Sequence, residues 1–162
     1  MRAVDTNVLV RLITRDDTRQ VVAAERFVER GAWVSHLVLA EATGVLTSVY
    51  ERDPDEIATA VDMLLEHQHL TLQDPDAVTA ALAHFRRRPA LLFSDCLVLE
   101  VARKAGHLPL RTFDRHLAKL DGAERLREHS PTTRTSAAPK DVKSKRHGRP
   151  SGDHVLRPTV GC

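Results

Sequence analysis

The sequence predicts an α/β protein of three layers, α/β/α, in which helices cover both faces of a central parallel sheet. Three observations support this prediction. Short apolar runs alternate with longer segments of helical periodicity along most of the chain. Two Asp-Pro-Asp sequences, which are typical of helix starts, separate the apolar runs in the middle of the chain. The chain has 162 residues, of which 42% are hydrophobic, so it is long enough to bury one core.

The first part of the chain is expected to contain two strands and two helices. Residues 2–4 and 32–34 are short stretches that predict strands, the second of them directly after Gly31. Residues 18–30 predict a helix, because valine, alanine and phenylalanine recur there at helical spacing. Residues 36–50 predict the next helix.

The later elements follow from clear start and stop signals. Asp53 and Asp74 each precede a proline, which predicts a capping aspartate followed by proline at the first helical position. The apolar stretch 70–72 between these two helices is predicted to be a strand. Residues 95–104 predict a helix that ends at Gly106, residues 108–112 a strand and residues 114–120 a final short helix.

The composition changes near residue 129. From there to residue 162 the chain is rich in small polar residues, proline and glycine, with seven Lys or Arg and only two Asp. Such a segment cannot bury enough apolar surface to offset the entropy lost on ordering. We therefore expect a folded, net acidic domain at residues 1–128 and a basic, disordered tail at residues 129–162.

Several classes of protein are disfavoured by composition. The two cysteines, Cys96 and Cys162, provide neither a disulfide framework nor a zinc-binding spacing, which fits a cytoplasmic protein. No apolar stretch has the length of a membrane span, and Asp5 and Arg11 interrupt the first apolar run too early for a signal peptide. The formal net charge of +2 does not by itself indicate a nucleic-acid partner.

Three aspartates are expected at one edge of the sheet. Asp5 follows the first strand, Asp95 follows the apolar run 91–93, and Asp114 follows the strand at 108–112. In a parallel sheet, functional groups gather beyond the carboxyl ends of the strands. Each aspartate is also a favoured helix N-cap, and a cap need not exclude a second role.

Glu41 is a fourth acidic candidate. In a helix it would share a face with Val38, Val45 and Val49. A carboxylate on such an apolar stripe loses hydration unless it finds a positive partner. The alternative is a half-exposed glutamate at the border of the stripe.

Four carboxylates at one edge would require a cation. Like charges close together destabilise the fold unless a positive ion lies among them. Oxygen ligands without His or Cys indicate Mg²⁺ or Mn²⁺. The chemistry that such sites usually support is displacement at phosphorus.

Four ordered motifs carry a resemblance to a known family. The segments VDTNVLVRL, LAE, FSDCLVLEVARKAG and RTFDRHLAKL resemble those of the PIN-domain ribonucleases, above all the VapC-type toxins of bacterial toxin–antitoxin pairs. The likeness spans residues 1–128. It implies a PIN-like fold and an Mg²⁺- or Mn²⁺-dependent endoribonuclease that leaves a 5′-phosphate and a 3′-hydroxyl. The implied catalytic and metal-binding residues are Asp5, Glu41, Asp95 and Asp114.

The resemblance also implies partners, namely an RNA substrate, a second copy of the chain and a small antitoxin protein, with no role for a membrane. Other residues are candidates for support of the site or for binding RNA phosphates. The supporting candidates are Thr6, Asn7, Ser94 and Thr112, and the candidate RNA contacts are Arg11, Arg86, Arg87, Arg88 and Arg115. The cluster 86–88 has an alternative role, complementing the helix dipole at a helix end.

Other functions remain open at this point. A phosphatase of the haloacid-dehalogenase type also begins with an acid after its first strand, but it needs a second aspartate where this chain has Asn7. A non-catalytic PIN-like scaffold or an interaction module, with the acids acting as helix caps, is the remaining alternative.

Overall fold

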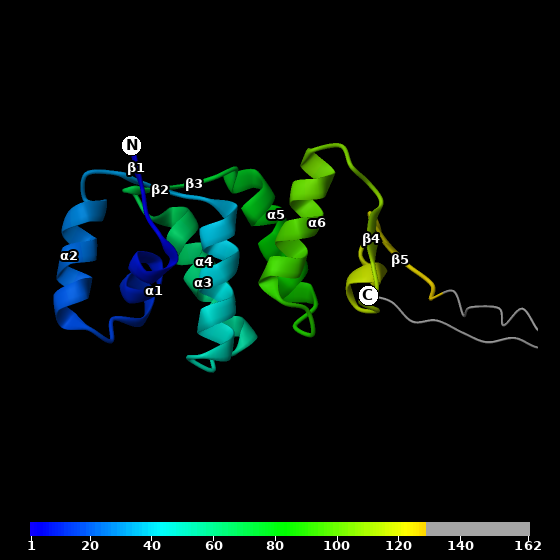
Figure 1. The fold of residues 1–162 in the computed structure, drawn as a ribbon, viewed down its shortest axis with the longest axis horizontal. Coiled ribbons are helices and arrows are strands. Elements are labelled where there is room, and N and C mark those ends of the chain that lie inside the picture. The colour runs from blue at the N-terminus through cyan, green and yellow to red at the C-terminus, as the bar shows by residue number, and fades with distance from the viewer. Residues whose placement is uncertain (129–162) are drawn as a thin grey trace, which may run out of the picture. The chain divides into compact units, whose positions relative to one another are not determined.

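The computed structural model describes residues 1–128, and the tail predicted at residues 129–162 lies outside the described residues. Figure 1 shows helices and short strands alternating along the chain, which confirms the α/β class. The elements are β1 (Arg2–Ala3), α1 (Thr6–Thr14), α2 (Thr18–Val28), β2 (Ala32–Val34), α3 (His36–Ser48), α4 (Pro54–Glu66), β3 (Leu70–Leu72), α5 (Pro75–Arg87), α6 (Phe93–Lys104), β4 (Leu110–Thr112), the 3₁₀ helix η1 (Leu117–Lys119) and β5 (Ala123–Arg125).

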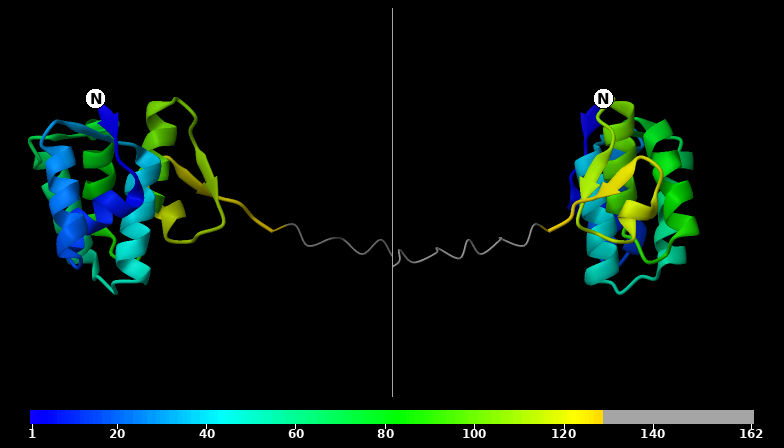
Figure 2. Two further views of the ribbon diagram at one scale, coloured as in Figure 1. Left: turned by 60° about the vertical axis from the view of Figure 1, so that its left-hand side comes forward. Right: turned by 90° about the vertical axis from the view of Figure 1, so that its right-hand side faces the viewer.

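All strand pairs are parallel, as predicted, and they form two sheets. The first sheet has the order β1-β2-β3, with Ala3 opposite Trp33 and Trp33 opposite Thr71. The second contains only β4 and β5, with Arg111 opposite Glu124. Figures 1 and 2 show β4 and β5 beyond α6, on the opposite side of α3 and α6 from β1. The strands therefore do not form one continuous sheet within residues 1–128.

Aspartate is the N-cap residue of four of the six α-helices in residues 1–128, and in three of them its side chain makes the capping bond. Asp53 caps α4 in a full capping box with Glu56, and proline follows directly. Asp17 caps α2 by accepting from the Gln20 amide at 3.0 Å. Asp74 departs from this pattern. It has a left-handed backbone and makes no capping bond, and its carboxylate pairs instead with Lys104, which lowers the pKa of Asp74.

Four local differences from the sequence prediction affect the site. The helix α1, which the periodicity did not identify, begins directly after Asp5. The helix predicted at 95–104 begins earlier, at Phe93 within the apolar run 91–93, so Asp95 is its third residue. The last predicted helix is reduced to η1, and β5 follows it in an Ala-Glu-Arg stretch without strand alternation.

The core is built from apolar side chains of β2, β3 and the inner faces of all six α-helices, together with Val4 directly after β1. In α6, Phe93 is 2% exposed and meets the ring of Phe85 edge to face, with the ring centroids 6.0 Å apart. Glu100 of α6 is buried beside this core, and its carboxylate contacts the side chains of His84 and Arg103. No helix in residues 1–128 has the length and apolar character needed to cross a membrane.

Candidate functional site

Asp5 lies where β1 passes into α1. Its extended backbone ends the strand, and its Oδ1 accepts a hydrogen bond from the Val8 amide at 2.9 Å. The residue is therefore an N-cap, but it is exposed, and its Oδ2 has no hydrogen-bond partner among the described residues. Asn7 is exposed on the next turn. Oδ2 of Asp5 is thus available to a ligand, while Oδ1 caps α1.

Glu41 reaches the same place from α3. The Thr6 hydroxyl donates to its Oε2 at 2.5 Å, which joins the middle of α3 to the residue after Asp5. Glu41 is exposed, and the buried residues of α3 are Leu39, Ala42, Thr43 and Leu46. Val38 and Val45 are partly buried against the core, so Glu41 lies at the border of the apolar face, as the alternative interpretation expected, and it is more exposed than that interpretation assumed.

Asp95 lies in the first turn of α6, where the sequence predicted the start of a helix. Its Oδ2 accepts from the Leu92 amide at 3.2 Å, at the third helical position. The neighbouring Ser94 lines a small hollow between α3 and α6, together with Thr43 and Thr47 of α3. The first turn of α6 thus lies against α3, the helix that carries Glu41.

Asp114 is held by the turn after β4. Its Oδ1 accepts from the amides of His116 at 2.6 Å and Leu117 at 2.8 Å. These two N–H groups lower the pKa of Asp114 because they stabilise its charged form. Its own amide donates to the Thr112 hydroxyl at 3.0 Å, so Thr112 supports this turn. The carboxylate is ionised at neutral pH, as an ion ligand must be.

The structure brings only part of the predicted quartet together. Thr6 links Glu41 to the turn of Asp5, whereas Asp114 lies with β4 on the far side of α6 (Figures 1 and 2). Within residues 1–128, no group of three or more His, Cys, Asp or Glu side chains is arranged to hold a metal ion.

The candidate RNA-binding arginines fall into two groups. Arg11 contacts Asp16, Gln20 and Tyr50, and Arg86 pairs with Asp62, so both already have partners. Arg87, Arg88 and Arg115 form no ion pair with any other described residue. The first two end α5 just before Asp95, and the third directly follows Asp114.

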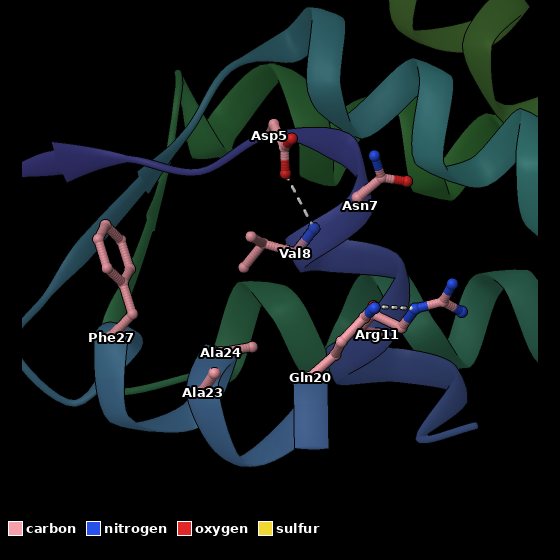
Figure 3. A pocket seen from close by; sticks show the side chains of 8 residues that line it. All are labelled: Asp5, Asn7, Val8, Arg11, Gln20, Ala23, Ala24 and Phe27. Atoms are coloured by element: carbon pink, nitrogen blue, oxygen red, sulfur yellow. Dashed lines mark hydrogen bonds between the residues drawn. The ribbon is translucent and has the colours of Figure 1, made fainter. Parts of the chain in front are cut away.

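A hollow of about 360 Å³ opens beside Asp5 between α1 and α2 (Figure 3). Its wall is mainly apolar, with Val8 from α1 and Phe27 from α2, and polar groups of Arg11 and Gln20 at one end. The α2 residues that line it are Gln20, Ala23, Ala24 and Phe27. These residues are three or four positions apart, as residues on one face of a helix are, so their spacing in the sequence could have identified them.

The comparisons with known proteins give one match. The family model described as the PIN domain matches residues 2–123, which include Asp5, Glu41, Asp95 and Asp114. No curated protein and no solved structure gives a significant match.

Proposed function

The chain belongs to the PIN-domain family, whose members are generally nucleases, and we propose that it is an endoribonuclease that depends on Mg²⁺ or Mn²⁺. Its substrate would be RNA in the cytoplasm, and the products would carry a 5′-phosphate and a 3′-hydroxyl. The divalent ion would supply an activated water and stabilise charge on the phosphate. Asp5, Glu41, Asp95 and Asp114 would be its ligands.

One contact carries this proposal, the 2.5 Å hydrogen bond from Thr6 to Glu41. It connects two residues that are 35 positions apart and holds an exposed carboxylate against the residue that follows Asp5. An exposed glutamate has no need of such a bond to remain hydrated. A pair of acids held together at the end of β1 is what a divalent ion requires from its first two ligands.

The alternative, a non-catalytic PIN-like scaffold, has one observation in its favour. Asp5, Asp95 and Asp114 each accept hydrogen bonds from backbone amides, as helix and turn caps do. In each residue only one carboxylate oxygen is used, and the other has no partner among residues 1–128. Capping therefore explains the position of each residue, and it leaves an oxygen for a second role.

The substrate proposal is supported by the location of the unpaired arginines. Arg87 and Arg88 lie at the end of α5, in the segment of the chain that leads into α6 and Asp95, and Arg115 directly follows Asp114. Cations beside an acidic site can bind the phosphates on either side of the bond to be cut. We further propose that the chain is the toxin of a toxin–antitoxin pair, inhibited by a small antitoxin protein that covers this site.

The test compares two aspartate caps of the same geometry. Asp5→Asn and Asp17→Asn both keep a side-chain oxygen that can cap a helix, so both variants should fold with nearly unchanged stability. Each protein is incubated with total RNA and Mg²⁺, and the cut ends are mapped. We expect Asp5→Asn to lose more than about 100-fold in cleavage rate, beyond what loss of an outer support costs.

Asp17→Asn should cleave like the wild type, because its carboxylate lies at the start of α2 and belongs to none of the four motifs. Cleavage by Asp5→Asn within about twofold of the wild-type rate would show that Asp5 is only a cap. Loss of cleavage on chelation of divalent ions, with recovery on addition of Mn²⁺, tests the metal requirement separately.

A further inference from the structure

The hollow between α1 and α2 has Asp5 on its rim but takes no part in the metal chemistry proposed for that residue (Figure 3). We propose that this hollow binds one base of a single-stranded RNA, beside the phosphate held at Asp5, and that it selects uracil or guanine over cytosine or adenine. The inference rests on the proposed function, since it takes Asp5 as the residue that holds the phosphate through the ion.

The size and position of the hollow suit a single nucleotide. Its volume of about 360 Å³ is near the lower end of the range for small-ligand sites, about 300–1,000 Å³. Oδ1 of Asp5 is bonded to the Val8 amide, so Oδ2 is the atom left for an ion and a phosphate. In single-stranded RNA the base of that nucleotide is free to turn away from its neighbours. A phosphate at Asp5 therefore brings a base to the mouth of the hollow.

The walls of the hollow are apolar surfaces against which a flat ring can pack. Ala23 and Ala24 of α2 have short side chains that leave room, and Val8 lines the hollow from α1. Phe27 lies at one end, and the guanidinium carbon of Arg2 is 4.0 Å from the centre of its ring. Aromatic rings and arginine planes are the groups on which proteins stack unpaired RNA bases.

The polar end of the hollow presents a hydrogen-bond donor. Nε of Arg11 donates to Oε1 of Gln20 at 2.7 Å (Figure 3). Because the Arg11 Nε–H group can only donate, the oxygen of the Gln20 amide must face it, and the NH₂ group of that amide is turned away. This NH₂ group has no acceptor among residues 1–128. Arg11 therefore fixes Gln20 with its donor available to a ligand.

A donor at this end of the hollow distinguishes the four bases. Uracil presents the acceptor O4 and guanine the acceptor O6, whereas cytosine and adenine present amino groups, which are donors. Two donors that face each other both remain without a partner, and this weakens binding. The Gln20 amide therefore favours uracil or guanine, and an acceptor in its place should favour cytosine or adenine.

The first experiment measures base selection without reference to cleavage. Fluorescently labelled oligo-uridylate and oligo-cytidylate of equal length are titrated with the full chain, with Ca²⁺ in place of Mg²⁺, and the intact RNA is verified on a gel. The two RNAs have the same charge and differ in the acceptor or donor at position 4 of the base. We expect the wild type to bind oligo-uridylate at least about fivefold more tightly.

Gln20→Glu should reverse this preference. The carboxylate still accepts from Arg11, and its second oxygen replaces the NH₂ group by an acceptor. The position lies in the first turn of α2, where an acid is favourable, so the variant should fold. Gln68→Glu makes the same change of charge at an exposed position outside this hollow and should keep the wild-type ratio of the two affinities.

The second experiment fills the hollow. Ala23→Phe places a ring in the space for the base from an exposed position of α2. Val22→Phe adds the same ring at the neighbouring exposed position, which does not line the hollow. We expect Ala23→Phe to bind oligo-uridylate at least about fivefold more weakly, as the loss of one stacked base implies, and Val22→Phe to bind it like the wild type. Urea midpoints verify that both variants are folded.

No measurable binding of either RNA, equal binding of both by the wild type, or an unchanged ratio in Gln20→Glu would overturn the proposed base selection. Unchanged binding by Ala23→Phe would overturn the base site, and the hollow would then be open to a different occupant, such as a side chain of an inhibiting protein. If the wild type binds with the expected preference but cleaves no RNA in Mg²⁺, the proposed nuclease function fails and the base site stands. If the wild type cleaves RNA and Ala23→Phe binds and cleaves it equally well, the base site fails and the nuclease function stands.

Discussion

At the scale of single residues, the acids of this chain have the same local role in different surroundings. Asp5, Asp17, Asp53 and Asp114 all accept backbone N–H groups at the start of a helix or turn. What separates Asp5 from Asp17 is the second acid, Glu41, brought beside it by the Thr6 hydroxyl. The distinction between a cap and a ligand therefore lies in what another part of the chain contributes.

Asp16 gives a residue-scale prediction about pH. The Tyr50 hydroxyl and the Thr14 hydroxyl, together with Arg11, lower the pKa of Asp16 from 3.8 to about 2. Between these two pH values the unfolded chain binds more protons than the folded one, so stability falls as the pH falls from about 4 to about 2. Asp16→Asn should therefore be less stable than the wild type at pH 7, and the difference should shrink below pH 4.

The measurement is the urea midpoint of both proteins at a series of pH values. Tyr50→Phe removes the largest cause of the low pKa of Asp16 and should reduce the same pH dependence in part. A stability difference between wild type and Asp16→Asn that stays constant down to the acid limit of folding would contradict the prediction.

At the scale of elements, α6 belongs both to the hydrophobic core and to the candidate site. Its inner face is buried against α3 and α5, and its first turn carries Asp95. Its outer face is exposed, with Val98 at 53% and Val101 at 38% exposure. The two faces should respond differently to the removal of apolar side chains.

Phe93→Ala should lower the free energy of unfolding by about 3–5 kcal/mol, because it leaves a cavity beside Phe85. Val98→Ala, on the exposed face of the same helix, should change it by less than about 0.5 kcal/mol. Urea denaturation of both variants tests this, and equal losses would mean that the outer face of α6 is also covered in solution.

The attachment of β5 gives a second prediction at this scale. Gly106 and Gly122 both have positive φ, +77° and +85°, but only Gly122 lies against a neighbour. A Cβ at residue 122 would lie 2.8 Å from Nη2 of Arg103, whereas none of the atoms around residue 106 is within 4 Å. Gly106→Ala should cost about 1–2 kcal/mol through its backbone conformation alone.

Gly122→Ala should cost more than Gly106→Ala in the free energy of unfolding, because Arg103 must also leave its place against Asp121. Thermal or urea unfolding of the two variants measures the difference. If the two variants lose the same amount, Arg103 does not hold β5 in solution.

At the scale of the whole molecule, the division of the strands into two sheets has the largest consequence. It separates Asp114 from Asp5 within a chain and leaves one open edge on each sheet.

Short-range chemistry was sufficient to predict much of this molecule. The capped helix start at Asp53, the helix start at Pro75, the strands at 32–34 and 70–72 and the parallel α/β class depend on neighbouring residues and periodicity, and the structure has them. The cap predicted at Asp74 is absent, because that carboxylate pairs with Lys104. The four acids were identified in the same way, from motifs a few residues long. Asp114 follows its strand as predicted, and Asp95 lies in the first turn of the predicted helix, which begins two residues earlier, at Phe93.

The remaining features depend on contacts between distant segments. The sequence alone indicated an apolar stripe through Glu41, but packing against α1 and α6 selected the face with Leu39, Ala42 and Leu46. The pattern of apolar residues likewise predicted one sheet and could not show which edges meet. Which helix face is buried and which strands pair depend on the apolar area that the whole chain can bury and on the hydrogen bonds that it can form. A short segment does not contain that information.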